Sequence, residues 1–341
     1  MNNTLTKEIV GNLPALQFIE KVAALGRNNY LSDSYILTGY DPRVSLMAAN
    51  WLFKALACLD KLAWPCDDCL HCHQITSGSF PDFYQISIEA DKRNIGIEQI
   101  KEMIGRLGLS SFTNNYRFVL INNAESLSLS AANSLLKTLE EPGARIVIVL
   151  LASDINNLPA TIVSRSQVVH FRQVSSDLLF DYLMKQEGMK RSLAKSIARL
   201  SLGSFGAAER YLKNEQLYNS RVESATAFAL VLDADLNQRL KYAQTIVDKK
   251  SEVSGLQDLV ALWQSVIRDL LLLNLNQPDL IANDSLRGLL NERRMNFGIK
   301  RLVEANKSLA ALRTNLSANV NPQMSLENAL EWIEEDESVE V

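Results

Sequence analysis

The chain has 341 residues with 35 basic and 39 acidic side chains, which gives a formal net charge of -4. This length predicts two or three domains, and a hydrophobic fraction of 47% excludes a largely disordered chain. The near balance of charges argues against a free-standing nucleic-acid-binding protein, which is usually strongly basic. A place in a larger DNA-binding assembly stays compatible with this composition.

The sequence shows neither a membrane-spanning pattern nor a secretory signal. Its apolar runs, such as 118–121 and 146–152, fall far short of the roughly 18 residues that a spanning helix needs. Residues 1–11 are polar and lack the apolar stretch of a signal peptide. We therefore expect a cytoplasmic protein without membrane contacts.

Short apolar runs alternate with helical patterns in the first half of the chain. The expected strands are Ser34–Thr38, Phe83–Ile88, Arg117–Ile121, Arg145–Leu151 and Gln167–Phe171. The expected helices between them are Val44–Leu59, Ile97–Leu109 and Ser130–Leu139. Nearly continuous Val, Ile and Leu runs are typical of a parallel sheet that is covered on both faces. The pattern predicts an α/β domain with a five-stranded parallel sheet and flanking helices.

Beyond residue 174 the chain carries helical patterns only. The expected helices are 175–186, 190–201, 206–213, 222–232, 236–249, 256–275, 286–291, 297–316 and 324–334. Turn signals at Gly188, Gly203 and Pro278 separate some of them. We predict an α/β domain over residues 1–172, a small helical domain over 173–213 and an all-α domain over 214–341.

All four cysteines lie close together in the sequence. Cys58, Cys66, Cys69 and Cys72 form the pattern C-x7-C-x2-C-x2-C. Four thiolates can surround one Zn²⁺ tetrahedrally and leave no position open for catalysis, so the pattern predicts one structural zinc in a module of about residues 58–80. His71 and His73 are alternative ligands, and an iron–sulfur cluster or four free thiols are the competing interpretations of the spacing.

The segment after the first expected strand has the position of a phosphate-binding loop but lacks its residues. It begins at Gly39, whereas the phosphate-loop pattern G-x-x-x-x-G-K-[ST] would continue with Gly, Lys and Ser or Thr. The chain has Val44, Ser45 and Leu46 at those three positions. It therefore lacks the glycine for close backbone approach, the phosphate-binding lysine and the Mg²⁺-binding hydroxyl.

The third expected strand ends in a similarly altered way. Asn122 and Asn123 stand where a nucleoside triphosphatase carries the carboxylates that bind Mg²⁺ and activate water. An amide cannot act as a general base. The two segments together predict the scaffold of a nucleotide hydrolase whose catalytic groups are missing.

Several segments together resemble one protein family, the delta-prime subunits of the bacterial DNA polymerase III clamp loader. They are the four-cysteine module, LLKTLEEP ending at Pro142, LPATIVSRS over 158–166 and NVNP over 319–322. The chain departs from the family's Ser-Arg-Cys signature, because Ser166 stands at the Cys position. The resemblance covers nearly the whole chain.

The resemblance implies an AAA+ α/β module with a helical lid, followed by a helical collar for oligomerisation. Five such subunits would form a ring that opens the sliding clamp and loads it on primed DNA. The expected partners are the ATPase (gamma/tau) and delta subunits, with clamp and DNA reached through the complex. The chain would be a non-catalytic part of the DNA polymerase holoenzyme that binds no ATP. By position, Arg165 would be its arginine finger, donated in trans to a neighbouring ATPase. The alternative is a solvated loop residue or a local salt-bridge partner.

Two further positions are compared with the family's ATPases. Ser153 follows the fourth expected strand, where the ATPases sense the γ-phosphate, and Gly206 replaces a second nucleotide-contacting arginine. An active clamp-loader ATPase and a zinc-containing DNA-binding module are the alternative functions. The missing lysine, hydroxyl and carboxylates argue against the first, and the net charge of -4 argues against the second.

Overall fold

The computed structural model describes residues 5, 9–28, 31, 33–90, 92–113, 115–186, 188–249, 253–317 and 320–331. The chain divides into two compact units. Unit 1 comprises residues 1–182 with 203–206, and unit 2 comprises residues 183–202 with 207–341.

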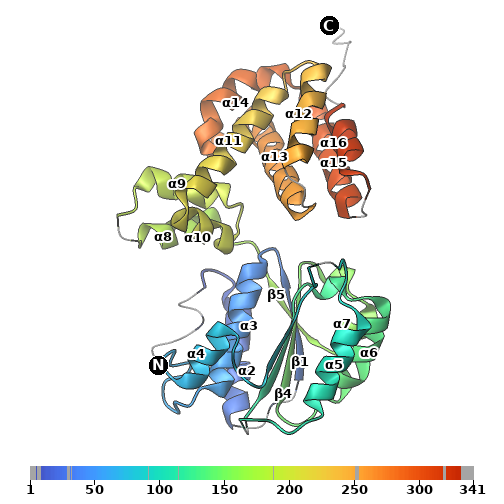
Figure 1. Ribbon diagram of the computed structural model, residues 1–341. Coiled ribbons are helices and arrows are strands. Elements are labelled where there is room, and N and C mark those ends of the chain that lie inside the picture. The colour runs from blue at the N-terminus through green and yellow to red at the C-terminus, as the bar shows by residue number, and fades with distance from the viewer. Residues whose placement is uncertain are drawn as a thin grey trace. The chain divides into compact units, whose positions relative to one another are not determined.

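Unit 1 is built on a five-stranded sheet (Figure 1). The strands are β1 (Asp33–Gly39), β2 (Phe83–Ile86), β3 (Arg117–Ile121), β4 (Ile146–Ala152) and β5 (Gln167–Phe171). Their order across the sheet is β2-β3-β4-β1-β5, and all neighbours run parallel. Every residue of β4 is buried, as the apolar runs predicted. The predicted parallel sheet is confirmed, with β2 ending two residues earlier than expected.

Helices cover both faces of this sheet. They are α2 (Leu13–Asn28), α3 (Pro42–Ala57), α4 (Leu70–Ser77), α5 (Ile97–Leu107), α6 (Leu129–Glu140) and α7 (Ala160–Val163). Figure 1 shows α2, α3 and α4 on one face and α5, α6 and α7 on the other. Helices α2, α4 and α7 were not among the expected elements. The short α4 begins inside the cysteine segment, where ligand spacing masks helical periodicity.

The sheet order determines which loops meet. Strands β3, β4 and β1 are neighbours, so their carboxyl ends share one edge of the sheet. In open α/β sheets, ligands bind at this edge. The segments that start at Gly39, Asn122 and Ser153 follow these three strands and therefore lie at the same edge.

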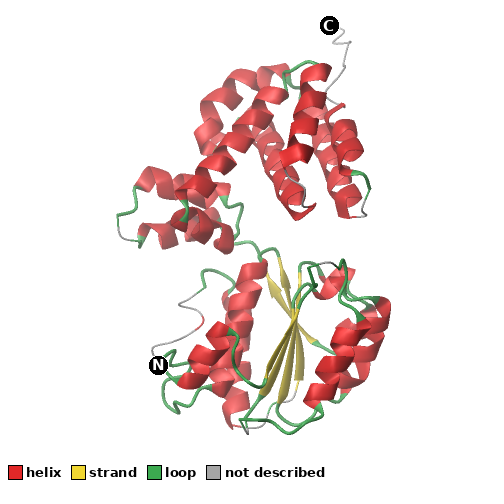
Figure 2. Cartoon of the chain, viewed as in Figure 1, coloured by secondary structure: helices red, strands yellow, loops and turns green. Residues whose placement is uncertain are grey.

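Unit 2 consists of helices, and Figure 2 shows no strand beyond β5 in the part of the chain that the structure describes. The helices after β5 are α8 (Ser176–Met184, which crosses the unit boundary), α9 (Arg191–Leu200), α10 (Phe205–Lys213), α11 (Glu215–Val231), α12 (Leu236–Lys249), α13 (Val253–Asn274), α14 (Arg287–Arg293), α15 (Ile299–Ser317) and α16 (Pro322–Glu331). The end of the last expected helix, 332–334, and Asn319 of the NVNP segment lie outside the described residues. Among the described helices, none combines the length and the apolarity needed to cross a bilayer.

Helix α13 is the centre of unit 2 and packs against α11, α14 and α15. Its Trp263 is fully buried and stacks on Phe228 of α11, with ring centroids 4.7 Å apart. The apolar stripe of α13 is buried: Leu256, Leu259, Leu262, Val266 and Leu270. Trp263 and this stripe form the core on which the other helices pack.

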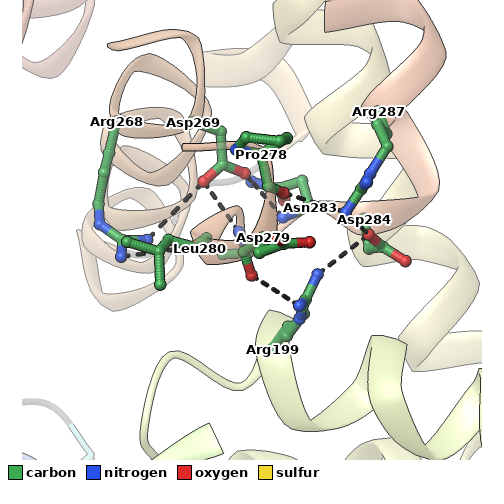
Figure 3. A network of polar contacts seen from close by, with 10 residues as sticks. Arg199, Arg268, Asp269, Pro278, Asp279, Leu280, Asn283, Asp284 and Arg287 are labelled. Carbon is green, nitrogen blue, oxygen red and sulfur yellow. Dashed lines mark hydrogen bonds and ion pairs between the residues drawn. The ribbon is translucent and has the colours of Figure 1, made fainter. Parts of the chain in front are cut away.

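One buried carboxylate organises the turn that follows α13 (Figure 3). Asp269 is fully buried and accepts hydrogen bonds from the backbone amides of Ala282 and Asn283 and from the Asn283 side chain, at 2.7–2.9 Å. Burial raises the pKa of Asp269 above its ordinary value, although these hydrogen bonds oppose the shift. Arg199 of α9 is joined to the same turn through Asp284 and the Asp279 carbonyl. The network therefore fixes the end of α9 to the turn inside unit 2.

Candidate functional site

The four cysteine sulfurs converge in unit 1 and all lie within 4.8 Å of one another. Cys58 is the residue that ends α3, Cys66 lies in the following loop, and Cys69 and Cys72 lie at the start of α4. Cys58 and Cys72 are buried, whereas Cys66 and Cys69 are partly exposed. Four sulfurs bound to one zinc at about 2.3 Å lie roughly 3.8 Å apart, so the cluster needs only small shifts to hold the ion.

The environment of these thiols suits a metal that prefers thiolates. The Cys69 amide donates a hydrogen bond to Cys66 Sγ at 3.3 Å. Burial opposes the Cys69 thiolate, but hydrogen bonds from the Leu59 and Cys72 backbone outweigh it and lower the pKa of Cys69 to about 7. Burial raises the pKa values of Cys58 and Cys72. The set of four sulfur donors fits zinc, and it would leave no coordination position for substrate.

The two histidines of the module lie outside this cluster. His71 places Nδ1 2.8 Å from the Ala57 carbonyl oxygen, and its ring meets Phe80 edge-on with centroids 5.2 Å apart. His73 is exposed. The geometry therefore favours the four cysteines as the ligand set over either histidine alternative.

The segment at the phosphate-loop position is packed with side chains. Gly39 is needed for packing, since a Cβ on it would lie 2.1 Å from the Phe171 carbonyl oxygen. Val44 and Ser45 are buried in the first turn of α3, and Leu46 is half-buried. Two of the three positions that would carry Gly, Lys and Ser or Thr are thus buried, and the third is partly buried.

Asp41 supplies an internal negative charge at the start of α3. It is buried, and its carboxylate accepts hydrogen bonds from the Arg43 amide at 3.1 Å, the Ser204 hydroxyl at 2.9 Å and the Gly206 amide at 2.7 Å. A helix N-terminus is a natural site for a phosphate because its free amides and its dipole attract anions. Here the Arg43 amide of α3 meets a carboxylate of the chain itself, and the Gly206 amide of α10 meets the same carboxylate. The sequence indicates part of this arrangement, because an Asp directly before Pro42 is typical of the start of a helix.

Gly206 has no room for a side chain. A Cβ at this position would lie 2.9 Å from Asp41 Oδ1 and 2.9 Å from two Arg43 side-chain carbons. The second nucleotide-contacting arginine of the related ATPases therefore has no space here in the described conformation.

The asparagines and Ser153 lie at the carboxyl edge of the sheet, as their positions predicted. Asn123 adopts a left-handed backbone conformation with φ 51°, which asparagine tolerates better than most residues. Ser153 donates from its hydroxyl to Glu125 Oε1 at 2.7 Å and from its amide to the same oxygen at 3.2 Å. Glu125, which the sequence analysis did not single out, thus binds both the hydroxyl and the amide of Ser153.

Arg165 lies between α7 and β5, on the surface of unit 1. Its Nε donates to Glu140 Oε1 at 2.5 Å, and its Nη1 donates to the Thr161 carbonyl oxygen at 3.0 Å and to the Ser164 hydroxyl. The backbone beneath it is anchored, because the buried Ser34 hydroxyl donates to the Arg165 carbonyl oxygen at 2.7 Å. About a third of the Arg165 side chain is exposed, and among the described residues its Nη2 has no hydrogen-bond partner. The two N–H groups on Nη2 are therefore available to another molecule.

Comparisons with known proteins support the family resemblance. Residues 16–175 match the family described as DNA polymerase III, delta subunit. The DNA polymerase III subunit delta' of Bacillus subtilis is 25% identical over 89% of this chain and 92% of its own length. The subunit delta' of Haemophilus influenzae is 31% identical, over 45% of this chain and 47% of its own length.

One solved structure shares the fold over most of the chain. It is a DNA polymerase III gamma subunit-related protein from Thermotoga maritima, 20% identical, with a TM-score of 0.51 and coverage of 92% of this chain and 98% of its own. At this identity the likeness concerns the fold alone. Together with the sequence matches it confirms the resemblance to delta-prime subunits and the AAA+-like fold.

Proposed function

We propose that this chain, a relative of the DNA polymerase III delta-prime subunits, is a stator of the clamp loader that helps load the sliding clamp on primed DNA. It would bind no ATP itself and would assemble with the ATPase (gamma/tau) and delta subunits in the cytoplasm. Its share in the chemistry of the holoenzyme would be Arg165, offered in trans to the ATP site of a neighbouring subunit.

The observation that carries this proposal is the contrast between Arg165 and the chain's own nucleotide-site position. Arg165 has an anchored backbone and two N–H groups on Nη2 without a partner among the described residues. The local phosphate-loop position instead holds buried Val44 and Ser45, and the amides near it are bound to Asp41. A guanidinium placed on a γ-phosphate stabilises the charge of the transition state, and such fingers raise rates by about 10³–10⁵ in related systems.

The cysteine cluster would hold one structural zinc, with Cys58, Cys66, Cys69 and Cys72 as ligands. A bound zinc would fix the loop between α3 and α4 and would take no part in hydrolysis, because a four-cysteine site has no open position. Residues 1–172 and 173–213 would act as the AAA+ module and its lid, and 214–341 as the collar that joins the ring.

The first test asks what the full-length chain assembles with. A tagged chain, purified from its native lysate, should recover subunits that retain an intact G-x-x-x-x-G-K-[ST] loop, identified by mass spectrometry. Recovery of no such subunit would contradict the stator role. Calorimetry on the isolated chain should detect no Mg-ATP binding with Kd below about 10 µM; tighter binding would favour an active ATPase.

The second test addresses Arg165 in the reconstituted complex. Arg165→Ala should lower ATP turnover at the site that it faces by about 10³-fold or more, while gel filtration shows an intact assembly. The control is Arg172→Ala, which removes an exposed arginine of the same unit. Unchanged clamp- and DNA-stimulated turnover in Arg165→Ala would overturn the finger assignment.

A further inference from the structure

Arg27, in the last turn of α2, bonds to the segment that carries the first cysteine. Its Nη1 donates to the Ala55 carbonyl oxygen at 2.7 Å and to the Cys58 carbonyl oxygen at 3.1 Å, and its Nη2 donates to the Asp60 carbonyl oxygen at 2.5 Å. One guanidinium thus binds a carbonyl before Cys58, the carbonyl of Cys58 itself and one just after it.

Two physical effects make these contacts strong. The last carbonyls of a helix have no partner within the helix and carry partial negative charge, so a cation at that end of α3 is favoured. The planar guanidinium also presents several donors in a fixed geometry, which a lysine cannot do. Arg27 therefore fixes the backbone direction in which α3 ends.

Arg27 also reaches the far part of the spacer between Cys58 and Cys66. Its guanidinium carbon lies 5.3 Å from the centre of the Trp64 ring, within the range of a cation–π contact. The Trp64 ring in turn meets Trp51 of α3, with centroids 6.4 Å apart. The same side chain therefore contacts both the start of the spacer and its end.

The end of α2 is itself held firmly against α3. A Cβ on Gly26 would lie 2.5 Å from Leu56 Cδ2, so the two helix ends approach as closely as a glycine permits. The Tyr116 hydroxyl donates to the Gly26 carbonyl oxygen at 2.7 Å. Arg27 accordingly extends from a fixed point in the core of unit 1.

We infer that Arg27 is a positioning residue for the metal centre, which holds Cys58 and the spacer in the geometry that the ion requires. Cys66, Cys69 and Cys72 are separated by two residues each, so local turns bring them together, whereas Cys58 lies eight positions before Cys66 and depends on tertiary contacts. A zinc with four thiolates carries a net charge of about -2, which a neighbouring guanidinium helps to offset. This inference rests on the proposed zinc site.

The test compares zinc affinities of full-length variants, measured by competition with a chromophoric chelator. Arg27→Met should raise the zinc Kd about 10–100-fold, the usual effect of losing a group that supports a metal ligand. Arg27→Lys, which keeps the charge but loses the fork of donors, should fall between Arg27→Met and the unaltered chain. The matched control is Arg106→Met on α5, which covers the opposite face of the sheet (Figure 1) and leaves the affinity unchanged.

Urea unfolding of the zinc-free variants separates positioning from general stabilisation. The positioning role requires that the rise in the zinc Kd of Arg27→Met exceeds what its loss of zinc-free stability explains. If Arg27→Met does not fold, the same comparison is made with Arg27→Lys. If folded Arg27→Met has the same zinc Kd as the wild-type chain, the inference is overturned but the zinc proposal is not. If the wild-type chain itself binds no zinc, both the zinc proposal and the inference are overturned.

Discussion

The two ends of α3 are both candidate ligand sites, and they differ in the groups that surround them. At its C-terminal end the chain keeps four sulfurs within 4.8 Å, with Cys58 as the residue that ends the helix. At its N-terminal end, the position of the expected phosphate loop, the Asp41 carboxylate binds the Arg43 amide of α3 and the Gly206 amide of α10. One end presents a set of metal donors, and the other is closed by the chain's own anion.

The difference shows how each end satisfies its unpaired backbone groups. Unpaired amides at a helix start attract an anion, and unpaired carbonyls at a helix end attract a cation. Asp41 and Arg27 meet these two needs internally. Asp41 occupies the place of a ligand, whereas Arg27 leaves the sulfurs of the neighbouring loop uncovered for a metal.

The largest effect is expected from removal of a metal ligand. Cys72→Ser should abolish tight zinc binding, because a closed site of four cysteines loses one of its ligands, and structural zinc is worth about 10–16 kcal/mol in small zinc-binding peptides. Elemental analysis should give about one zinc per unaltered chain and far less in the variant. His73→Ala is the matched control; loss of zinc there would restore histidine as a ligand.

The pH dependence of zinc binding should be the next largest effect. Burial raises the pKa values of Cys58 and Cys72, so both thiols hold protons near neutral pH and must release them to bind the metal. Cys69, with its pKa lowered to about 7, adds a further proton only below that pH. These two thiols alone should therefore raise the zinc Kd by at least about 100-fold for each unit that the pH falls between roughly 8 and 7. Chelator competition at both pH values checks this, and a flat profile would contradict the buried thiols.

A smaller effect is expected at the other end of α3. Asp41→Ala leaves the Arg43 and Gly206 amides without their acceptor, and loss of a helix cap together with an unsatisfied buried amide costs about 2 kcal/mol. Urea denaturation should show this as a lower free energy of unfolding, with Asp41→Asn in between. Asp177→Ala, at an exposed position in the first turn of α8, serves as the control and should change stability by less than about 0.5 kcal/mol. Equal losses of unfolding free energy in Asp41→Ala and Asp177→Ala would mean that Asp41 is an ordinary surface cap.

Much of the fold of unit 1 follows from local sequence patterns. The runs at 117–121 and 167–171 were predicted with the bounds that the structure has. Four of the five residues of 117–121 are buried, whereas in 167–171, at the edge of the sheet, buried Val169 and Phe171 alternate with more exposed residues. Both patterns are typical of strands. Helix α2 was missed, although its buried residues Leu16, Ile19 and Val22 recur at helical spacing. The start of α11 was placed seven residues late, since the polar first turns of that helix carry little apolar periodicity.

The candidate site divides in the same way. The C-x7-C-x2-C-x2-C spacing and the missing phosphate-loop residues are properties of the chain alone, because they depend on residue type and separation along the sequence. The hydrogen-bond partners of these residues come from segments distant in sequence. Arg27 of α2 bonds to the Cys58 carbonyl, the Gly206 amide bonds to Asp41, and Arg165 bonds to Glu140.

The sequence by itself therefore determined the parallel α/β sheet, the helical second half and the chemical character of each candidate site. Only the tertiary structure decided that the phosphate position is filled by Asp41, that the histidines lie outside the cysteine cluster and that Arg165 keeps two donors free among the described residues. The physical reason is that periodicity and ligand spacing are local, whereas hydrogen-bond partners depend on the approach of segments that the chain separates by up to 165 positions.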